Sequence, residues 1–116
     1  MAIHEQQGMD IWIAINDQNA TKMVDALKEF GFDPPELKKE IFLKEKKVIR
    51  MGVPPMRLEI LTSIDGVNFK NCFNSRIVAD FGDFKVNFIS KDDLLINKRA
   101  SGRPQDIVDF EKLKIE

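Results

Sequence analysis

The sequence predicts a small domain of mixed α/β or α+β class, in which a mixed sheet packs against helices. A strand pattern near the N-terminus is followed directly by an amphipathic helix pattern, several strand patterns come next, and two helix patterns end the chain. With 116 residues the chain is long enough for one hydrophobic core of modest size. We therefore expect a single domain over residues 1–116.

Composition and charge narrow the class of protein. Hydrophobic residues make up 43% and charged residues 32%, and a net charge of -1 gives no overall basic field for unspecific nucleic-acid binding. The lone Cys72 and the lone His4 can form neither an internal disulfide nor a Cys/His zinc cluster. Because no export-signal pattern and no apolar run of roughly 20 residues are present, a cytoplasmic protein is expected.

The first strand is expected over residues 10–15, "DIWIAI". Alternation puts Ile11, Ile13 and Ile15 on one face. Asp10 and Trp12 share the other face, which is also largely apolar, so this strand is expected inside the sheet.

The next segment has the clearest helix pattern of the chain. Asn16 or Asp17 is expected to cap its start, and Gly31 is expected to end it. The expected buried stripe consists of Ala20, Met23, Val24, Leu27 and Phe30.

A proline turn then opens "DPPELKKEIFLKEKK", which holds a short helix pattern and a charged run at 44–47 that we expect in solvent. "VIRMG" and "RLEILTSI" are strand patterns, and a turn is expected at Asp65-Gly66. "RIVADFGDFKVNFIS" predicts a hairpin around Gly82-Asp83.

Two helices are expected at the C-terminal end. Ser90 caps the first, on which residues 91, 94, 95 and 98 share a face, so that Lys98 falls in line with the buried Leu94 and Leu95. Gly102 breaks this helix. Pro104 suits the first position of the second helix, with Asp106 and Asp109 following in its first turns.

One carboxylate stands out within an apolar strand. In "RLEILTSI" the alternation places Arg57 and Glu59 on one face and Leu58 and Ile60 on the other. Glu59 therefore either pairs with Arg57 or another cation at a sheet edge, or serves as a metal ligand. Both interpretations stay open at this point.

Cations gather near the C-terminal end of the chain. Lys98, Arg99 and Arg103 could hold a phosphate chain, although cations also complement the dipole at a helix end. For Asp106, a place in the first turn of a helix would be favourable in any protein.

Three segments together resemble the nucleotidyltransferase superfamily, in particular the small bacterial nucleotidyltransferase-like proteins related to the toxin of abortive-infection toxin-antitoxin pairs. They are "DIWI", "VPPMRLEILTSIDGVNF" and "LLINKRASGRPQDIVDFEKL", in this order and at the family's usual spacing. The resemblance covers about Asp10 to Leu113, and its last segment is the most specific.

The resemblance implies Mg²⁺-dependent transfer of a nucleoside monophosphate from a nucleoside triphosphate (NTP) to a hydroxyl on RNA, protein or a small molecule. Asp10 matches the second aspartate of the family's metal-binding pair and Glu59 the third carboxylate, so both are expected as catalytic residues and Mg²⁺ ligands. The nucleotide-binding residues expected from the resemblance and the cation cluster are Lys98, Arg99, Arg103 and Asp106.

The sequence also departs from the family pattern. Gly8 stands where the first aspartate is expected, which leaves the metal site incomplete and predicts impaired transfer. The family's N-terminal helix, first strand and glycine-rich turn have no counterpart in "MAIHEQQ", in which "AIH" resembles the end of the helix after that turn. The chain is thus similar to an N-terminally shortened member, and a sheet edge left open predicts a homodimer.

Two other functions stay open. A catalytically inactive relative would act as a protein-interaction or regulatory module, as Gly8 and the short N-terminal segment favour. A plain α/β binding domain with purely structural carboxylates predicts that Asp10 and Glu59 lie far apart.

Overall fold

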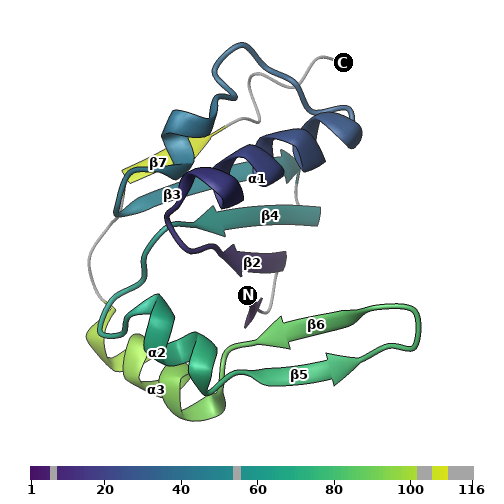
Figure 1. Cartoon of the computed structure of the whole chain (residues 1–116). Helices are drawn as coiled ribbons and strands as arrows, with labels where there is room; N and C mark the ends of the chain where they lie inside the picture. Colours follow the sequence, from purple (N-terminus) through teal and green to yellow (C-terminus); the bar gives the residue numbers. More distant parts are fainter. Residues whose placement is uncertain (6–7, 54–55, 102–105, 110–116) are drawn as a thin grey trace.

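The computed structural model describes residues 1–5, 8–53, 56–101 and 106–109. In this part of the chain one mixed sheet is combined with helices (Figure 1). The strands are β1 (Ala2–Glu5), β2 (Gly8–Trp12), β3 (Lys47–Val53), β4 (Met56–Leu61), β5 (Ile77–Asp80), β6 (Lys85–Phe88) and β7 (Asp106–Asp109). The helices are α1 (Asp17–Glu29), the 3₁₀ turn η1 (Lys39–Phe42), α2 (Phe69–Asn74) and α3 (Lys91–Ala100).

The strand order across the sheet is β5-β6-β1-β2-β4-β3-β7. Strand β2 runs parallel to β4 and antiparallel to β1, and β4 runs antiparallel to β3. The outer pairs are β1 with β6 and β3 with β7, both parallel, and β5 with β6, antiparallel. The mixed sheet and its helices confirm the α+β class, and β2 lies inside the sheet as predicted.

Helix α1 covers one face of the sheet. Asn16 caps it by accepting a hydrogen bond from the Asn19 backbone N–H at 2.8 Å, and Gly31 follows with a φ of +83°. The buried side chains of the helix are Ala20, Val24 and Leu27. They pack against Ile49 and Ile60 of the sheet, and burial of each of these two isoleucines contributes about 1.5–3 kcal/mol.

The prediction of a buried side chain was wrong for one residue of the expected helix stripe. Phe30 is 88% exposed because it is the C-cap of α1, where the backbone leaves the helix and its side chain no longer follows the helical stripe. The proline turn and the short helix at η1 were predicted correctly, and Lys44, Glu45 and Lys46 are exposed as expected. Lys47, the last residue of the charged run, is half-buried because it begins β3.

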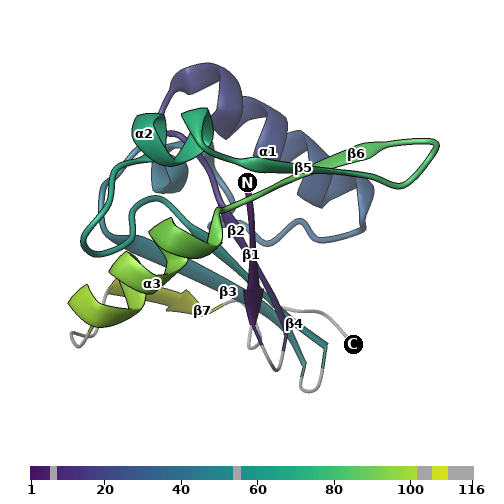
Figure 2. The same cartoon turned by 90° about the horizontal axis from the view of Figure 1, so that it is seen from below.

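The opposite face of the sheet packs against α2 and α3 (Figure 2). Trp12, Val48 and Leu61 alternate with the residues under α1 and lie with Cys72 of α2 in this second buried cluster. The sheet is therefore covered on both faces, by α1 and η1 on one side and by α2 and α3 on the other.

Three local predictions were wrong. The expected last helix is strand β7 in residues 106–109, where Ile107 and Val108 are β-branched and the segment pairs with the outer side of β3. "AIH" belongs to strand β1 and not to a helix end. Helix α2 was not expected at all, although Asn68 caps it by accepting from the Asn71 N–H at 2.9 Å.

Candidate functional site

Asp10 and Glu59 are neighbours on the sheet. Strands β2 and β4 are parallel, and the register pairs Asp10 with Glu59. Register partners point to the same face of a sheet, so the two carboxylates lie side by side, both partly buried. This arrangement contradicts the plain binding-domain interpretation, which requires them to lie far apart.

A cation lies next to Glu59 on the neighbouring strand, β3. Arg50 of β3 is the register partner of Glu59, and its Nε lies 2.9 Å from Glu59 Oε1. The two side chains are 26% and 24% exposed, so solvent screens the pair only in part. Glu59 thus pairs with a cation, as one of its two interpretations predicted, but on an interior strand. We call Asp10, Glu59 and Arg50 the carboxylate row.

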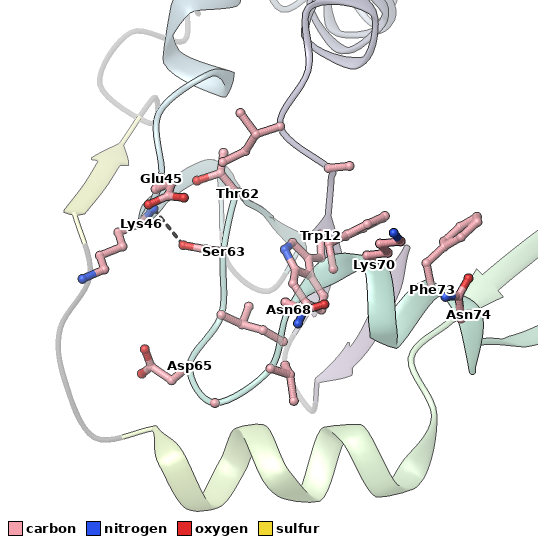
Figure 3. Close-up of a pocket in the computed structure, with 16 residues that line it drawn as sticks. Trp12, Glu45, Lys46, Thr62, Ser63, Asp65, Asn68, Lys70, Phe73 and Asn74 are labelled. Atoms are coloured by element: carbon pink, nitrogen blue, oxygen red, sulfur yellow. Dashed lines mark hydrogen bonds between the residues drawn. The ribbon is translucent and has the colours of Figure 1, made fainter.

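A pocket of about 760 Å³ opens on the same face, at the carboxyl ends of the parallel strands β2 and β4 (Figure 3). Trp12 is two residues beyond Asp10 on the same face, which puts the row roughly 7 Å from the pocket along β2. The lining residues labelled in the figure are Trp12, Glu45, Lys46, Thr62, Ser63, Asp65, Asn68, Lys70, Phe73 and Asn74. The lining is aromatic at its base and polar at its rim.

Trp12 is the aromatic base of this pocket. Its ring is 1% exposed and meets Phe69 edge to face, with 5.1 Å between the ring centroids. Its Nε1–H is the buried side-chain donor that has no hydrogen-bond partner within the described residues. Such a donor costs free energy when it is left unpaired.

The polar rim comes from two loops. Ser63 Oγ accepts a hydrogen bond from the Lys46 backbone N–H at 2.8 Å, which ties the loop before β3 to the loop after β4. On the other side, Asn97 of α3 donates to the Asp65 carbonyl at 3.0 Å. Sequence reasoning missed this pocket. The available signal was the single Trp at the end of an interior strand.

Lys98 does not lie on a buried stripe, contrary to the prediction. Helix α3 carries no buried residue, Leu95 is 43% exposed, and the side chains of Lys98 and Arg99 are exposed in its last turn. The contacts of the helix with the rest of the protein include the packing of Leu94, the bond that Asp93 accepts from Ser75 and the bond that Asn97 donates. This position suits cations that complement a helix C-terminus.

The other two expected nucleotide-binding residues bear less on the site. Arg103 lies outside the described residues. Asp106 begins β7, where its backbone is the register partner of Lys47, and is not in a helix. Three strand positions later, the backbone of Asp109 is the register partner of Arg50.

The buried thiol near the pocket is unsuited to nucleophilic chemistry. Burial, reinforced by the nearby Asp93, raises the pKa of Cys72 to about 11. A thiol with such a pKa is protonated at neutral pH and reacts poorly. Cys72 is therefore a core residue of α2.

The carboxylate row suits one hard cation better than two. Mg²⁺ is commonly held by one or two carboxylates together with phosphate oxygens and water, which Asp10 and Glu59 can satisfy. In the described part of the chain, no cluster of three or more His, Cys, Asp or Glu side chains forms a metal site. A two-metal centre would need a further carboxylate, which Gly8 cannot supply.

None of the helices described in the structure is long and apolar enough to cross a membrane. Comparison with protein-family models, with curated proteins and with solved structures found no match. The relationship to nucleotidyltransferases therefore stays a prediction from the three sequence segments.

Proposed function

We propose that this protein is a nucleotidyltransferase-like domain that binds a Mg²⁺–nucleotide complex at the carboxylate row, with impaired transfer activity. The observation that carries the proposal is the register pairing of Asp10 with Glu59 on adjacent parallel strands. Two carboxylates side by side offer oxygen ligands to one hard cation, as Mg²⁺ sites built from one or two carboxylates require.

In this proposal each residue of the row has a role. Asp10 and Glu59 hold the cation, and Arg50, whose Nε lies 2.9 Å from Glu59, competes with the cation for that carboxylate and so weakens its binding. When bound, Mg²⁺ neutralises charge on the phosphates during the in-line displacement of pyrophosphate by an acceptor hydroxyl. The exposed Lys98 and Arg99 add positive charge for phosphate groups, as the resemblance implies.

The pocket beyond the row suits the nucleoside part of the ligand. Its lining includes the aromatic pair of Trp12 and Phe69, and Asn68, whose side-chain NH₂ can donate while its Oδ1 caps α2. Lys46 and Lys70 add positive charge at its rim. A nucleoside with its phosphates directed toward Asp10 would span the roughly 7 Å between the pocket and the row.

The alternative is a catalytically inactive relative that acts through protein contacts. The Arg50–Glu59 ion pair favours it, because a guanidinium already occupies one carboxylate. Gly8 favours it as well, since it leaves the pair of aspartates incomplete.

Calorimetric titration of Mg²⁺-ATP and Mg²⁺-GTP into the purified chain tests the proposal. We expect Mg²⁺-dependent binding that Asp10→Asn and Glu59→Gln each weaken at least tenfold, and that Lys98→Ala weakens less. Glu40→Gln is the matched control, since Glu40 is exposed on η1, which packs against the other face of the sheet. No binding at millimolar nucleotide, or equal loss in the control, would overturn the proposal.

Transfer is measured separately, as pyrophosphate released from an NTP with RNA or protein present as the acceptor. Slow release that is lost in Asp10→Asn supports the enzyme. Binding without any release supports the inactive relative.

A further inference from the structure

Strand β5 ends the sheet and is apolar on both of its faces. Ile77 is 55% exposed and Val78, which points to the opposite face, is 48% exposed. Beyond the strand, Phe81 and Phe84 at the hairpin tip are 57% and 60% exposed and stack on each other with 5.4 Å between centroids. Together these four residues form the hairpin patch, which is independent of the nucleotide site proposed above.

Among the residues that the structure describes, the hairpin pairs with the rest of the sheet at its base. The register of β6 with β1 consists of the pair Ala2 and Phe88, and next to it the Ile89 N–H donates to the Ala2 carbonyl at 3.1 Å. From there the hairpin extends away from α2 and α3 (Figure 1). Natural edge strands are commonly protected by Lys or Pro, and β5, "IVAD", has neither.

The hydrogen-bond pattern of the hairpin fixes which backbone groups of β5 face outward. The Phe81 N–H donates to the Phe84 carbonyl at 3.0 Å. Bonded and non-bonded pairs alternate in an antiparallel ladder, so Ala79 and Ile77 direct their backbone groups toward β6. The N–H and C=O groups of Val78 and Asp80 therefore point to the outer edge, where a further strand can pair.

We propose that β5 pairs antiparallel with β5 of a second copy of this chain, about a two-fold axis at Val78. In this register Val78 exchanges both backbone hydrogen bonds with Val78 of the second copy. Arg76, whose side chain also donates two hydrogen bonds within its own chain, lies opposite Asp80 of the second copy, and the two-fold axis repeats this pair of opposite charges. Ile77 lies opposite Ala79, so the apolar side chains also meet.

Charge complementarity is the reason for choosing a second copy as the partner. The segment "RIVAD" is self-complementary when it is reversed, with a cation and an anion at equal distances from Val78. A two-fold axis at Ala79 would also let the outward backbone N–H and C=O groups of the two β5 strands pair. In that register, however, Val78 would lie opposite Asp80 of the second copy, and Arg76 would no longer lie opposite an aspartate. An isologous pairing of this kind closes as a dimer, because the β5 edges of both copies are then occupied.

The mass of the protein in solution tests the interface. We expect a dimer by sedimentation equilibrium, with a dissociation constant that Val78→Asp raises at least tenfold because two carboxylates then face each other. Phe30→Asp is the matched control, since it adds the same charge at an 88% exposed site away from the hairpin. A wild-type monomer throughout the micromolar range would overturn the proposal, as would equal weakening in both variants.

Cysteine cross-linking tests the register. Under mild oxidation Val78→Cys should form a disulfide-linked dimer, since directly opposed residues lie about 5.5 Å apart, within the range of a disulfide. Ala79→Cys should not, because it opposes Ile77 of the second copy. The native chain controls for Cys72, which is buried. Cross-linking of Ala79→Cys instead of Val78→Cys would place the axis elsewhere and overturn this register.

Discussion

Arg50 Nε lies 2.9 Å from Glu59 Oε1, and Asp10 is the register partner of Glu59 on its other side. The Glu59 carboxylate therefore contacts the Arg50 guanidinium on one side and faces the proposed metal position beside Asp10 on the other. Because the ion pair is about a quarter exposed, its net contribution to folding is modest, on the order of 1 kcal/mol. A bound cation and Arg50 compete for the same carboxylate.

Replacing Arg50 should therefore strengthen metal binding. In Arg50→Gln, Glu59 loses its competing cation, and we expect Mg²⁺ to bind several-fold more tightly. The free energy of unfolding should fall by about 1 kcal/mol without the metal and recover when Mg²⁺ is added. Calorimetry and urea denaturation measure the two effects. If Mg²⁺ affinity is the same in Arg50→Gln and in Glu59→Gln, the row does not hold the ion.

Gly8→Asp should also tighten Mg²⁺ binding. It places a carboxylate on β2 two residues before Asp10 and on the same face, at the position of the missing family aspartate. A third carboxylate should tighten binding on the order of tenfold. Gly8→Asn has the same size without the charge and is the matched control. Equal affinities for the two variants would contradict the proposed position of the metal.

Much of the fold could be predicted because its signals are local. The Asn16 cap, the Gly31 stop and the hairpin turn at Gly82-Asp83 each depend on a few adjacent residues, and each was correct. The segment at 106–109 was misread because "RPQD" resembles a helix start, whereas pairing with the outer side of β3 makes it a strand. Tertiary pairing of this kind leaves no mark within a short window of sequence.

The candidate site was predictable only in part for the same reason. Asp10 and Glu59 were identified from the resemblance, but their register across parallel strands is a non-local property. Lys98 was placed on a buried stripe because helical spacing aligns it with Leu94, yet α3 lies at the surface with no buried residue. The partner Arg50 and the pocket at Trp12 depend on strand order, which spacing along one element cannot show.

Gly66 holds the turn that supports the pocket against α3, so Gly66→Ala should destabilise the protein. Its φ is +83°, and a Cβ there would lie 2.6 Å from Ala100 Cβ and 3.3 Å from the Ile96 carbonyl oxygen. We expect a loss of about 2–3 kcal/mol in the free energy of unfolding, from backbone strain together with the overlap. Urea denaturation, followed by the fluorescence of the single Trp12, gives the value.

Gly82→Ala separates the two causes. Gly82 also has a positive φ, +91°, but a Cβ there meets nothing within 4 Å, so only the strain of about 1 kcal/mol applies. If both variants lose the same free energy, the contact with Ala100 adds nothing and α3 packs less closely on the turn than the structure shows.

Asp93 should make stability depend on pH in the acid range. Its Oδ2 accepts a hydrogen bond from Ser75 Oγ at 2.7 Å, and this bond is the main cause that lowers the pKa of Asp93 below 3.8. A lowered carboxyl pKa stabilises the folded state fully above the ordinary value of 3.8, and this stabilisation is lost as the pH falls through the folded-state pKa. Because the carboxyl is largely open to solvent, the effect should be no more than about 0.5 kcal/mol.

Urea denaturation between neutral pH and the acid limit of folding measures this contribution in Asp93→Asn. Asn accepts the same bond from Ser75 but does not titrate, so its deficit relative to the native chain should be present at neutral pH and shrink below about pH 4. Asp92→Asn is the control, because this neighbouring acid lies in the same first turn of α3 with an exposed side chain. An equal deficit in both variants would assign the effect to the helix dipole. The Ser75 hydrogen bond would then have no measurable part in it.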